Sequence, residues 1–471
     1  MQGLGAHQIA GMVRQRRAKA QAVMCDFLDR TERLEPRLNS YAWLDAEGAL
    51  AAAAEIDRRV DAGEDPGPLA GVPVSVKDLI AVAGLPLTFG SRQFAHNVAA
   101  QDAPSVQRVR AAGGCIVGKT TTSELGSKAV GDSPLTGTTA NPWRAGYTSG
   151  GSSAGAAAGV AAGLVPLALG TDGGGSIRIP ASFCGLVGIK GSFGRVPVWP
   201  ASATPGLAHV APLARTAREA ILLFEAIAGS HASDPASMQL ASWQWRERRG
   251  AMPGLRIGWC EDFEYGWADP EVKAATRQAA QVLCAALGTQ PRRWAGLRED
   301  PAFAWSTEFY AGIAARLGVA EAARADVEAQ LDPLLARQIQ HVRALGDQGR
   351  RDAQLQRARC AREIQGIFER FDLLLMPATP VTAFPAGRNA PAAYPGTGAV
   401  EWSYFTYPFN LSGNPAASFP VGLSCAGLPI GLQLVVRIGA EELLFNALLA
   451  LEAALPTPRL TEPQTASALL P

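Results

Sequence analysis

Histidine is scarce in this sequence. Five of the 471 residues are histidine, and none lies within thirty residues of Ser176, the serine that follows three glycines in TDGGGSIRIP (171–180). A serine nucleophile needs a base to accept its proton, and histidine is the commonest one. If Ser176 is a nucleophile, its base must be a distant histidine or another kind of residue.

Net charge is also small. The chain has 43 Lys and Arg residues against 42 Asp and Glu residues, a formal net charge of +1. Electrostatic binding to nucleic acid or to an anionic membrane calls for a basic excess, so neither is expected as a partner. The short basic run RQRRAK (14–19) is expected to be a solvated face. We expect a small-molecule substrate and a monomer or homodimer.

The cysteines lack the spacing of a metal site. Seven are scattered without a CxxC pair or neighbouring histidines, at positions 25, 115, 184, 260, 284, 360 and 425. Such a set is typical of reduced, buried thiols, and the N-terminus has no apolar signal segment, which together favour a cytoplasmic location. We expect neither a metal ion nor a cofactor.

Long hydrophobic runs are absent as well. The longest apolar stretch, AGAAAGVAAGLVPLALG (154–170), is mostly Ala and Gly and is broken by Pro166. It is too short and too weakly apolar to span a bilayer. It predicts a buried helix, at 152–163, followed by a strand at 164–169.

The sequence does contain an alternation of helix and strand patterns. Strands are predicted within 69–80, 115–118, 254–260, 371–380 and 427–436, and helices at 215–228 and 441–454. This alternation predicts an α/β fold with a large mixed central sheet covered by helices on both faces.

One domain is expected over residues 1–471. Its core would be formed by 60–230 and 371–455, with a helix-rich middle segment at 260–370 as an outer layer or insertion. A helix boundary is expected around Pro36, and the Pro-rich tail from 456 is expected to fray.

Two clusters of serine and glycine lie close together, TSGGSSAG (148–155) and TDGGGSIR (171–178). The first contains G-S-S-A-G, which matches the G-x-S-x-G nucleophile elbow of α/β-hydrolases at Ser153. An elbow needs a strand before the serine, whereas NPWRAGYTS (141–149) predicts a turn-rich loop. Its partners would have to come from the later histidines, at positions 209, 231 and 341.

A phosphate-binding loop is another alternative for the second cluster. Bare N–H groups of a glycine-rich loop can cradle phosphate at the start of a helix. However, residues 172–176 are not accompanied by a Walker lysine, and the strand–loop–helix frame of G-x-G-x-x-G is missing. The phosphate interpretation is therefore disfavoured.

Taken together, the two clusters and an upstream lysine resemble the amidase signature family. The resemblance is carried by GVPVSVKDLI (71–80), TSGGSSAGAAAGVAAGLVPLALGTDGGGSIRIPASFCG (148–185), TGTTANPW (136–143), FDLLLMPATP (371–380) and NLSGNPAASFPVGLSCAGLPIGLQLV (410–435). It covers most of the chain and is weakest over 230–370. A block of this length with a separate lysine motif is a specific match, and it implies the amidase signature fold.

This resemblance implies a Ser–Ser–Lys catalytic triad, which would replace the missing histidine. Lys77 takes the lysine position in VKD, Ser152 the bridging serine in GGSSAG, and Ser176 the nucleophile in DGGGS. The family places the bridging serine on a cis peptide, here Gly151–Ser152. Burial disfavours an ammonium ion, so a lysine in a dry site can lose its charge and act as the base.

The glycines before Ser176 suit an oxyanion hole. Acyl transfer develops negative charge on a carbonyl oxygen, and losing one aimed N–H donor costs roughly 2.7–4 kcal/mol. The expected donors are the N–H groups of Gly173, Gly174, Gly175 and Ser176. Ser153 is expected to orient the cluster, and Asp172 and Arg178 to act as a structural ion pair or loop anchor.

Two kinds of family member fit the sequence. The glutamyl-tRNA(Gln) amidotransferase member of the family usually carries DTGGSIRQP and a RYDGVRYG-like stretch, whereas this chain has DGGGSIRIP and lacks the second stretch. The resemblance therefore favours a stand-alone hydrolase of small aryl, acyl or oligomeric amides, extending to carbamates (urethanes) and esters, through an acyl-Ser176 intermediate. The glutamine amidase is the alternative. A non-catalytic binding protein on this fold is disfavoured because Lys77, Ser152 and Ser176 are all present.

Substrate specificity is expected to come from stretches outside the motifs. VWPASATPGLAHV (198–210), WSTEFYAG (305–312) and WSYFTYPFN (402–410) hold aromatic and small residues suited to an apolar acyl or aryl group. Asn410 and Asn414 could reach the substrate, although Asn in a loop more often stabilises a turn.

Overall fold

The computed structural model describes residues 3–239, 245–248, 250–318, 324–394 and 400–460. The expected fraying of the C-terminal tail falls mostly on 461–471, outside the described residues. Among the described helices, none has both the length and the apolarity needed to cross a bilayer.

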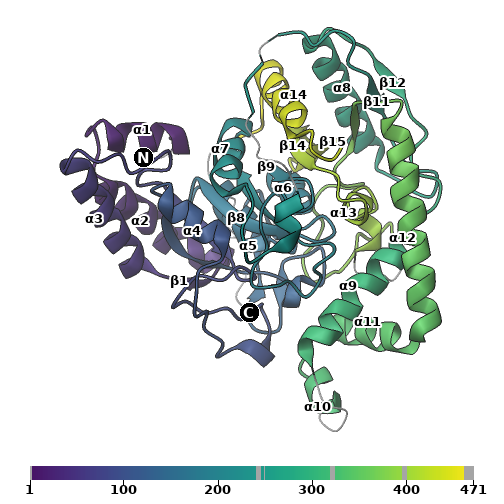
Figure 1. Ribbon diagram of the computed structural model, residues 1–471, viewed down its shortest axis with the longest axis horizontal. Helices are drawn as coiled ribbons and strands as arrows, with labels where there is room; N and C mark the ends of the chain where they lie inside the picture. Colours follow the sequence, from purple (N-terminus) through teal and green to yellow (C-terminus); the bar gives the residue numbers. More distant parts are fainter. Residues whose placement is uncertain (1–2, 240–244, 249, 319–323, 395–399, 461–471) are drawn as a thin grey trace.

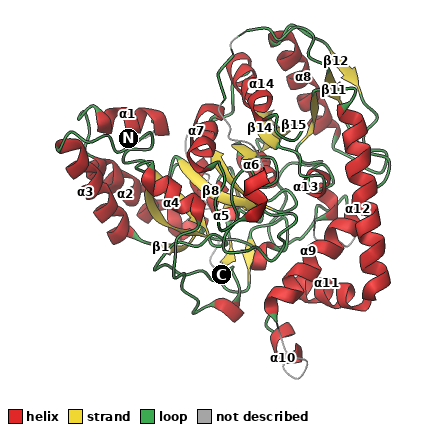
Figure 2. Ribbon diagram, in the orientation of Figure 1, coloured by secondary structure: helices red, strands yellow, loops and turns green. Residues whose placement is uncertain are grey.

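Within the described residues, eleven strands form one mixed sheet at the centre of the molecule (Figure 2). Their order is β1-β3-β2-β8-β10-β9-β14-β15-β13-β11-β12. The strands are β1 (Tyr41–Leu44), β2 (Pro73–Lys77), β3 (Cys115–Thr120), β8 (Leu167–Asp172), β9 (Val187–Lys190), β10 (His209–Ala214), β11 (Ile257–Trp259), β12 (Pro291–Arg293), β13 (Leu373–Pro377), β14 (Ala416–Leu423) and β15 (Pro429–Val436). Two short hairpins lie outside it, β4 (Asp132–Ser133) with β5 (Gly137–Thr138) and β6 (Ala140–Asn141) with β7 (Arg144–Thr148).

Helices cover both faces of this sheet, as the alternating pattern predicts. The helices are α1 (Ala6–Arg14), α2 (Ala20–Leu38), α3 (Ala46–Asp61), α4 (Pro104–Ala111), α5 (Ala154–Ala161), α6 (Arg178–Cys184), α7 (Ala217–Ile227), α8 (Pro270–Ala286), α9 (Ala302–Leu317), α10 (Arg324–Glu328), α11 (Pro333–Ala344), α12 (Gly346–Phe368), α13 (Pro408–Leu411) and α14 (Glu441–Ala454). Helices α5 and α6 pack together on one face, and α4, α7, α14 and α8 follow one another along the other. The predicted α/β fold class is confirmed.

The middle of the chain contributes to the sheet as well as to the outer layer. Helices α9, α11 and α12 pack together at one side of the molecule, far from the N-terminal helices α1–α3 (Figure 1). Strands β11 and β12 nevertheless extend the sheet in parallel to β13. Strand β11 lies in the stretch 254–260 that is predicted to be a strand, whereas the helix-dominated pattern of 260–370 does not indicate β12.

Of two local expectations, one is confirmed and one differs from the structure. Helix α2 ends at Leu38, two residues after Pro36, and the following Asn39 adopts a left-handed conformation with φ of 51°. The helix boundary expected around Pro36 is therefore confirmed. Residues 144–148, expected to be loop, form β7, which pairs with β6 and not with the main sheet.

Candidate active site

The candidate catalytic side chains meet at one edge of the sheet. Strands β2, β3 and β8 run parallel, so their carboxyl ends lie together, which is where open α/β sheets bind ligands. Lys77 ends β2, and Thr171 and Asp172 end β8. Ser152 and Ser153 precede α5. The small residues of this helix let it approach the backbone of Ser40 closely. A Cβ on Gly155 would clash with the carbonyl oxygen of Ser40.

Lys77, Ser152 and Ser176 form a continuous hydrogen-bonded chain. The Nζ of Lys77 lies 2.7 Å from the Oγ of Ser152, which lies 2.9 Å from the Oγ of Ser176. Lys77 and Ser152 are buried, whereas Ser176 is partly exposed. The Gly151–Ser152 peptide is cis. The structure thus brings together three residues that are separated by up to 99 positions in the sequence.

Lys77 has two further hydroxyl partners. Its Nζ donates to the Oγ of Ser153 at 3.0 Å and to the Oγ1 of Thr171 at 2.9 Å. The role expected of Ser153 therefore has a geometric basis. Thr171 is a partner that the sequence motifs do not single out, and the alternation of side chains along β8 is the available signal for it. Burial lowers the pKa of Lys77 well below its ordinary value, and the carboxylate of Asp172 opposes that effect in part.

Side chains from other segments hold two carbonyl groups of the loop 173–176, whereas the carbonyl of Ser176 accepts from the N–H of Ser153 at 3.2 Å. The carbonyl of Gly173 accepts from the Nε1 of Trp305 at 2.8 Å, and that of Gly174 from the Oγ1 of Thr406 at 2.7 Å. For the N–H groups of Gly173, Gly174 and Ser176, no acceptor is found among the residues that the structure describes. These donors remain available to a ligand.

The N–H of Gly175 differs from the other three. It donates to the Oδ1 of Asp172 at 2.8 Å, so this N–H is not free for the oxyanion, contrary to the expectation for Gly175. A carboxylate is a stronger acceptor than a neutral carbonyl, which explains why this donor is committed. Gly175 has a φ of 126°, and a Cβ there would clash with the Oγ1 of Thr406. Glycine is therefore required at this position.

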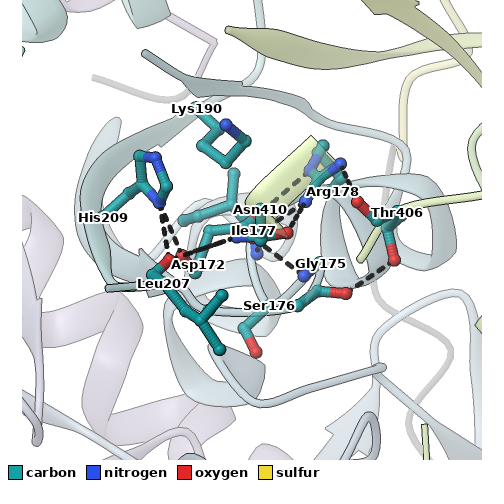
Figure 3. A network of polar contacts seen from close by, with 12 residues as sticks. Asp172, Gly175, Ser176, Ile177, Arg178, Lys190, Leu207, His209, Thr406 and Asn410 are labelled. Atoms are coloured by element: carbon teal, nitrogen blue, oxygen red, sulfur yellow. Dashed lines mark hydrogen bonds and ion pairs between the residues drawn. The ribbon is translucent and has the colours of Figure 1, made fainter. Parts of the chain in front are cut away.

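Asp172 and Arg178 form a fully buried ion pair behind the loop (Figure 3). The guanidinium contacts both carboxylate oxygens at 2.9 and 3.0 Å. It also donates to the side chain of Asn410 and to the carbonyl of Thr406. Burial alone would raise the pKa of Asp172, but Arg178 outweighs it and holds that pKa well below its ordinary value. In Figure 3 the Oγ of Ser176 points away from this network.

Asn410 and Asn414 have structural partners and do not line the pocket in front of Ser176. The amide of Asn410 donates to the carboxylate and carbonyl of Asp172. The amide of Asn414 donates to the carbonyl of Val436. Both residues are buried and satisfy backbone or ionic partners, as polar groups in a core must.

His209 lies beside the loop but is not positioned as a base for Ser176. Its Nδ1 contacts the carbonyl oxygens of Leu207 at 2.8 Å and Asp172 at 3.1 Å, so this nitrogen carries the proton. Burial lowers the pKa of His209 to about 3, and the imidazole is neutral. The other ring nitrogen has no partner among the described residues.

A mostly apolar pocket opens in front of Ser176. Its lining comprises Leu79, Ile80, Leu87, Phe89, Leu125, Gly126, Ser152, Thr171, Gly173, Ser176, Val198, Trp199, Pro200, Ala201, Ser202, Ala203, Thr204, Ala208, His209, Val210, Phe309 and Arg316. The stretch 198–210 thus provides one wall, as expected, and 305–312 provides Phe309. The aromatic residues of 402–410 are buried in the core, and from this stretch Thr406 contacts the glycine loop.

The sequence matches known proteins along most of its length. The family model described as Amidase matches residues 22–445. An acylamidase from Rhodococcus erythropolis is 35% identical over 465 residues, covering 96% of each chain. A glutamyl-tRNA(Gln) amidotransferase chain from Acidothermus cellulolyticus is also 35% identical, covering 95% of this chain and 94% of that one.

Solved structures show the same architecture. A bacterial aryl acylamidase of the amidase signature enzymes superposes with a TM-score of 0.87 at 29% identity, covering 96% of each chain. This similarity includes the helix-rich middle of the chain, where the sequence motifs are weakest.

Proposed function

The chain belongs to the amidase family, and on this basis we propose that it is a serine amidohydrolase of small amides. Ser176 is the nucleophile, Ser152 the bridging group and Lys77 the base. The observation that carries this proposal is the unbroken chain of contacts from Lys77 through Ser152 to Ser176, which ends at an apolar pocket.

Acylation requires a proton to leave Ser176. Neutral Lys77 accepts the proton of Ser152, while Ser152 accepts that of Ser176, whose Oγ attacks the amide carbonyl carbon. The displaced electron pair moves to the carbonyl oxygen, which the N–H groups of Gly173, Gly174 and Ser176 receive. Each such donor contributes about 3 kcal/mol to the transition state in related chemistry.

The leaving amine takes the proton back through the same path. Lys77 returns it to Ser152, which donates it to the nitrogen as the C–N bond breaks. Water then attacks the acyl-Ser176 ester with Ser152 and Lys77 again as the base, releasing the acid and restoring the free serine. The three hydroxyl groups around Lys77 accept hydrogen bonds from the transient ammonium.

The pocket favours an apolar acyl or aryl group over glutamine. Among the described lining residues there is no Asp or Glu to receive the ammonium group of glutamine. Buried unpaired charge is costly, so this absence argues against the glutamine amidase alternative. Esters and carbamates present the same carbonyl carbon to Ser176, and the proposal extends to both.

The cysteines and the net charge indicate where the protein works and what it binds. All seven cysteines are unpaired, which supports a reducing compartment such as the cytoplasm. The near-zero net charge gives no support for a nucleic-acid partner. We propose a small-molecule hydrolase that works as a monomer or homodimer.

Covalent labelling combined with a substrate panel tests the proposal. A fluorophosphonate is expected to modify Ser176, located by mass spectrometry, and to abolish hydrolysis of anilides, primary amides, p-nitrophenyl esters and dicarbamates. Ser176→Ala should lose both labelling and turnover. Ser202→Ala is the matched control, because Ser202 lines the same pocket but contacts Thr204 and not the triad.

Active protein in which Ser176 stays unlabelled would contradict the assignment of Ser176 as the nucleophile. Glutamine-dependent transamidation with partner subunits, without hydrolysis of the panel, would favour the alternative.

A further inference from the structure

Arg316 is the one ionised side chain among the described residues that line the pocket in front of Ser176. It lies in the last turn of α9, two residues before Gly318 ends that helix. The other titratable lining residue, His209, is neutral because burial lowers its pKa to about 3. The pocket therefore combines apolar walls with a single positive charge.

Two contacts position the exposed side chain of Arg316 at the pocket. Its guanidinium carbon lies 5.0 Å from the ring centroid of Phe89, which belongs to the wall that follows β2. Its Nη1 donates to the carbonyl oxygen of Ala201 at 3.0 Å, in the wall formed by 198–210. A cation held over an aromatic face by a further hydrogen bond has restricted freedom. The guanidinium thus bridges the two walls.

Most of the hydrogen-bonding capacity of Arg316 is unused. A guanidinium has five N–H donors, and the contact with Ala201 uses one of them. Within the described residues, no carboxylate oxygen forms an ion pair with Arg316. Some arginines of the middle segment are paired, such as Arg357 with Glu308 and Arg343 with Glu328, but neither of these lines the pocket. Arg316 differs in presenting its free donors at a pocket.

We propose that Arg316 binds a carboxylate carried by the substrate, so that the preferred amides are those whose pocket-bound part ends in a carboxylate. This inference rests on the proposed function and narrows its substrate class. Arginine recognises carboxylates through two parallel N–H···O bonds, which neutral chain ends cannot form. The apolar walls between Ser176 and Arg316 suit the aliphatic or aryl part of such a molecule.

Binding to the full chain carrying Ser176→Ala tests this without any need for turnover. The probes are adipanilic acid, with the carboxylate on the acyl side, 6-acetamidohexanoic acid, with it on the amine side, and hexananilide as the neutral analogue. Measured by calorimetry, the dissociation constant of at least one of the two acids should be lower than that of hexananilide by roughly tenfold or more. Adding Arg316→Gln should remove that preference while changing hexananilide affinity less than about threefold, and Arg316→Lys should retain part of it.

Arg92→Gln is the matched control variant. Arg92 is also exposed and also donates to a backbone carbonyl, that of Pro134, but it does not line the pocket. Its replacement should leave all three affinities unchanged. Equal affinity for acids and neutral analogue, or equal losses for both in Arg316→Gln, would overturn the inference. Wild-type turnover of hexananilide without any acid preference would leave the proposed function standing and refute the role of Arg316.

Discussion

The indole Nε1 of Trp305 donates a hydrogen bond of 2.8 Å to the carbonyl oxygen of Gly173. Trp305 belongs to α9, in the helix-rich middle of the chain, and is 1% exposed. Its ring also fills the space beside Gly174, where an added Cβ would lie 2.6 Å away. A helix remote in sequence therefore fixes the orientation of the proposed oxyanion donors.

Replacement of Trp305 by Phe removes this hydrogen bond and keeps an aromatic ring. A hydrogen bond of this kind contributes about 1 kcal/mol, so we expect kcat to fall roughly five- to tenfold. KM should change little, because the oxyanion donors act mainly in the transition state. Steady-state kinetics on one anilide would measure both constants.

Trp259→Phe provides the control for this prediction. The Nε1 of Trp259 is buried and has no partner among the described residues, and the residue lies in β11. Its kcat should stay within about twofold of the wild type, since no hydrogen bond is lost. Equal losses in both variants would mean that the effect of Trp305 is not specific to Gly173.

Activity should rise with pH along a limb set by Lys77. Burial lowers the pKa of Lys77 well below 10.5, and the base is active after it has lost its proton. We therefore expect kcat/KM to increase with pH and to level off below pH 10.5. The measurement is a pH–rate profile on a substrate with no titratable group. A profile that falls as pH rises through this range would contradict the role of Lys77 as base.

The same depressed pKa makes stability depend on pH. Because the unfolded chain keeps Lys77 protonated up to about pH 10.4, it binds more protons than the folded chain between the two pKa values. Stability from this group therefore increases as pH rises through that window. Relative to Lys77→Met, the wild type should gain free energy of unfolding as pH rises toward about pH 10.4, as measured by urea denaturation at each pH. A difference that does not vary with pH would refute this.

Breaking the buried ion pair should destabilise the fold. Asp172→Asn leaves the charge of Arg178 buried without its partner, at a cost of about 3–5 kcal/mol. Denaturant titration would measure the loss. Asp61→Asn is the comparison, because the Lys19–Asp61 pair is more than half exposed and such pairs contribute about 0–1 kcal/mol. Similar losses for the two variants would mean that burial does not set the value of the pair.

The alternation of helix and strand patterns in the sequence is enough to predict the α/β class and most strands near the site. It places strand β8 only approximately, at 164–169, whereas the strand spans Leu167–Asp172. This matters because the final residues of β8 include Thr171, the partner of Lys77 that the motifs do not reveal. Hydrophobic periodicity marks the buried part of a strand well and its polar end poorly. The sequence left open whether Asn410 and Asn414 reach the substrate, because a polar residue in a motif does not reveal whether it faces a ligand or the core.

The sequence by itself establishes which groups are available for chemistry. It contains a lysine, two serines and a run of glycines in the order of the amidase signature motifs, and few histidines. Folding sets what those groups touch. It places Lys77 among three hydroxyls, commits the N–H of Gly175 to Asp172, and brings Arg316 to the pocket without an acidic partner among the described residues. The reason is physical: hydrogen bonds and burial depend on distances between segments far apart along the chain, which local patterns do not contain.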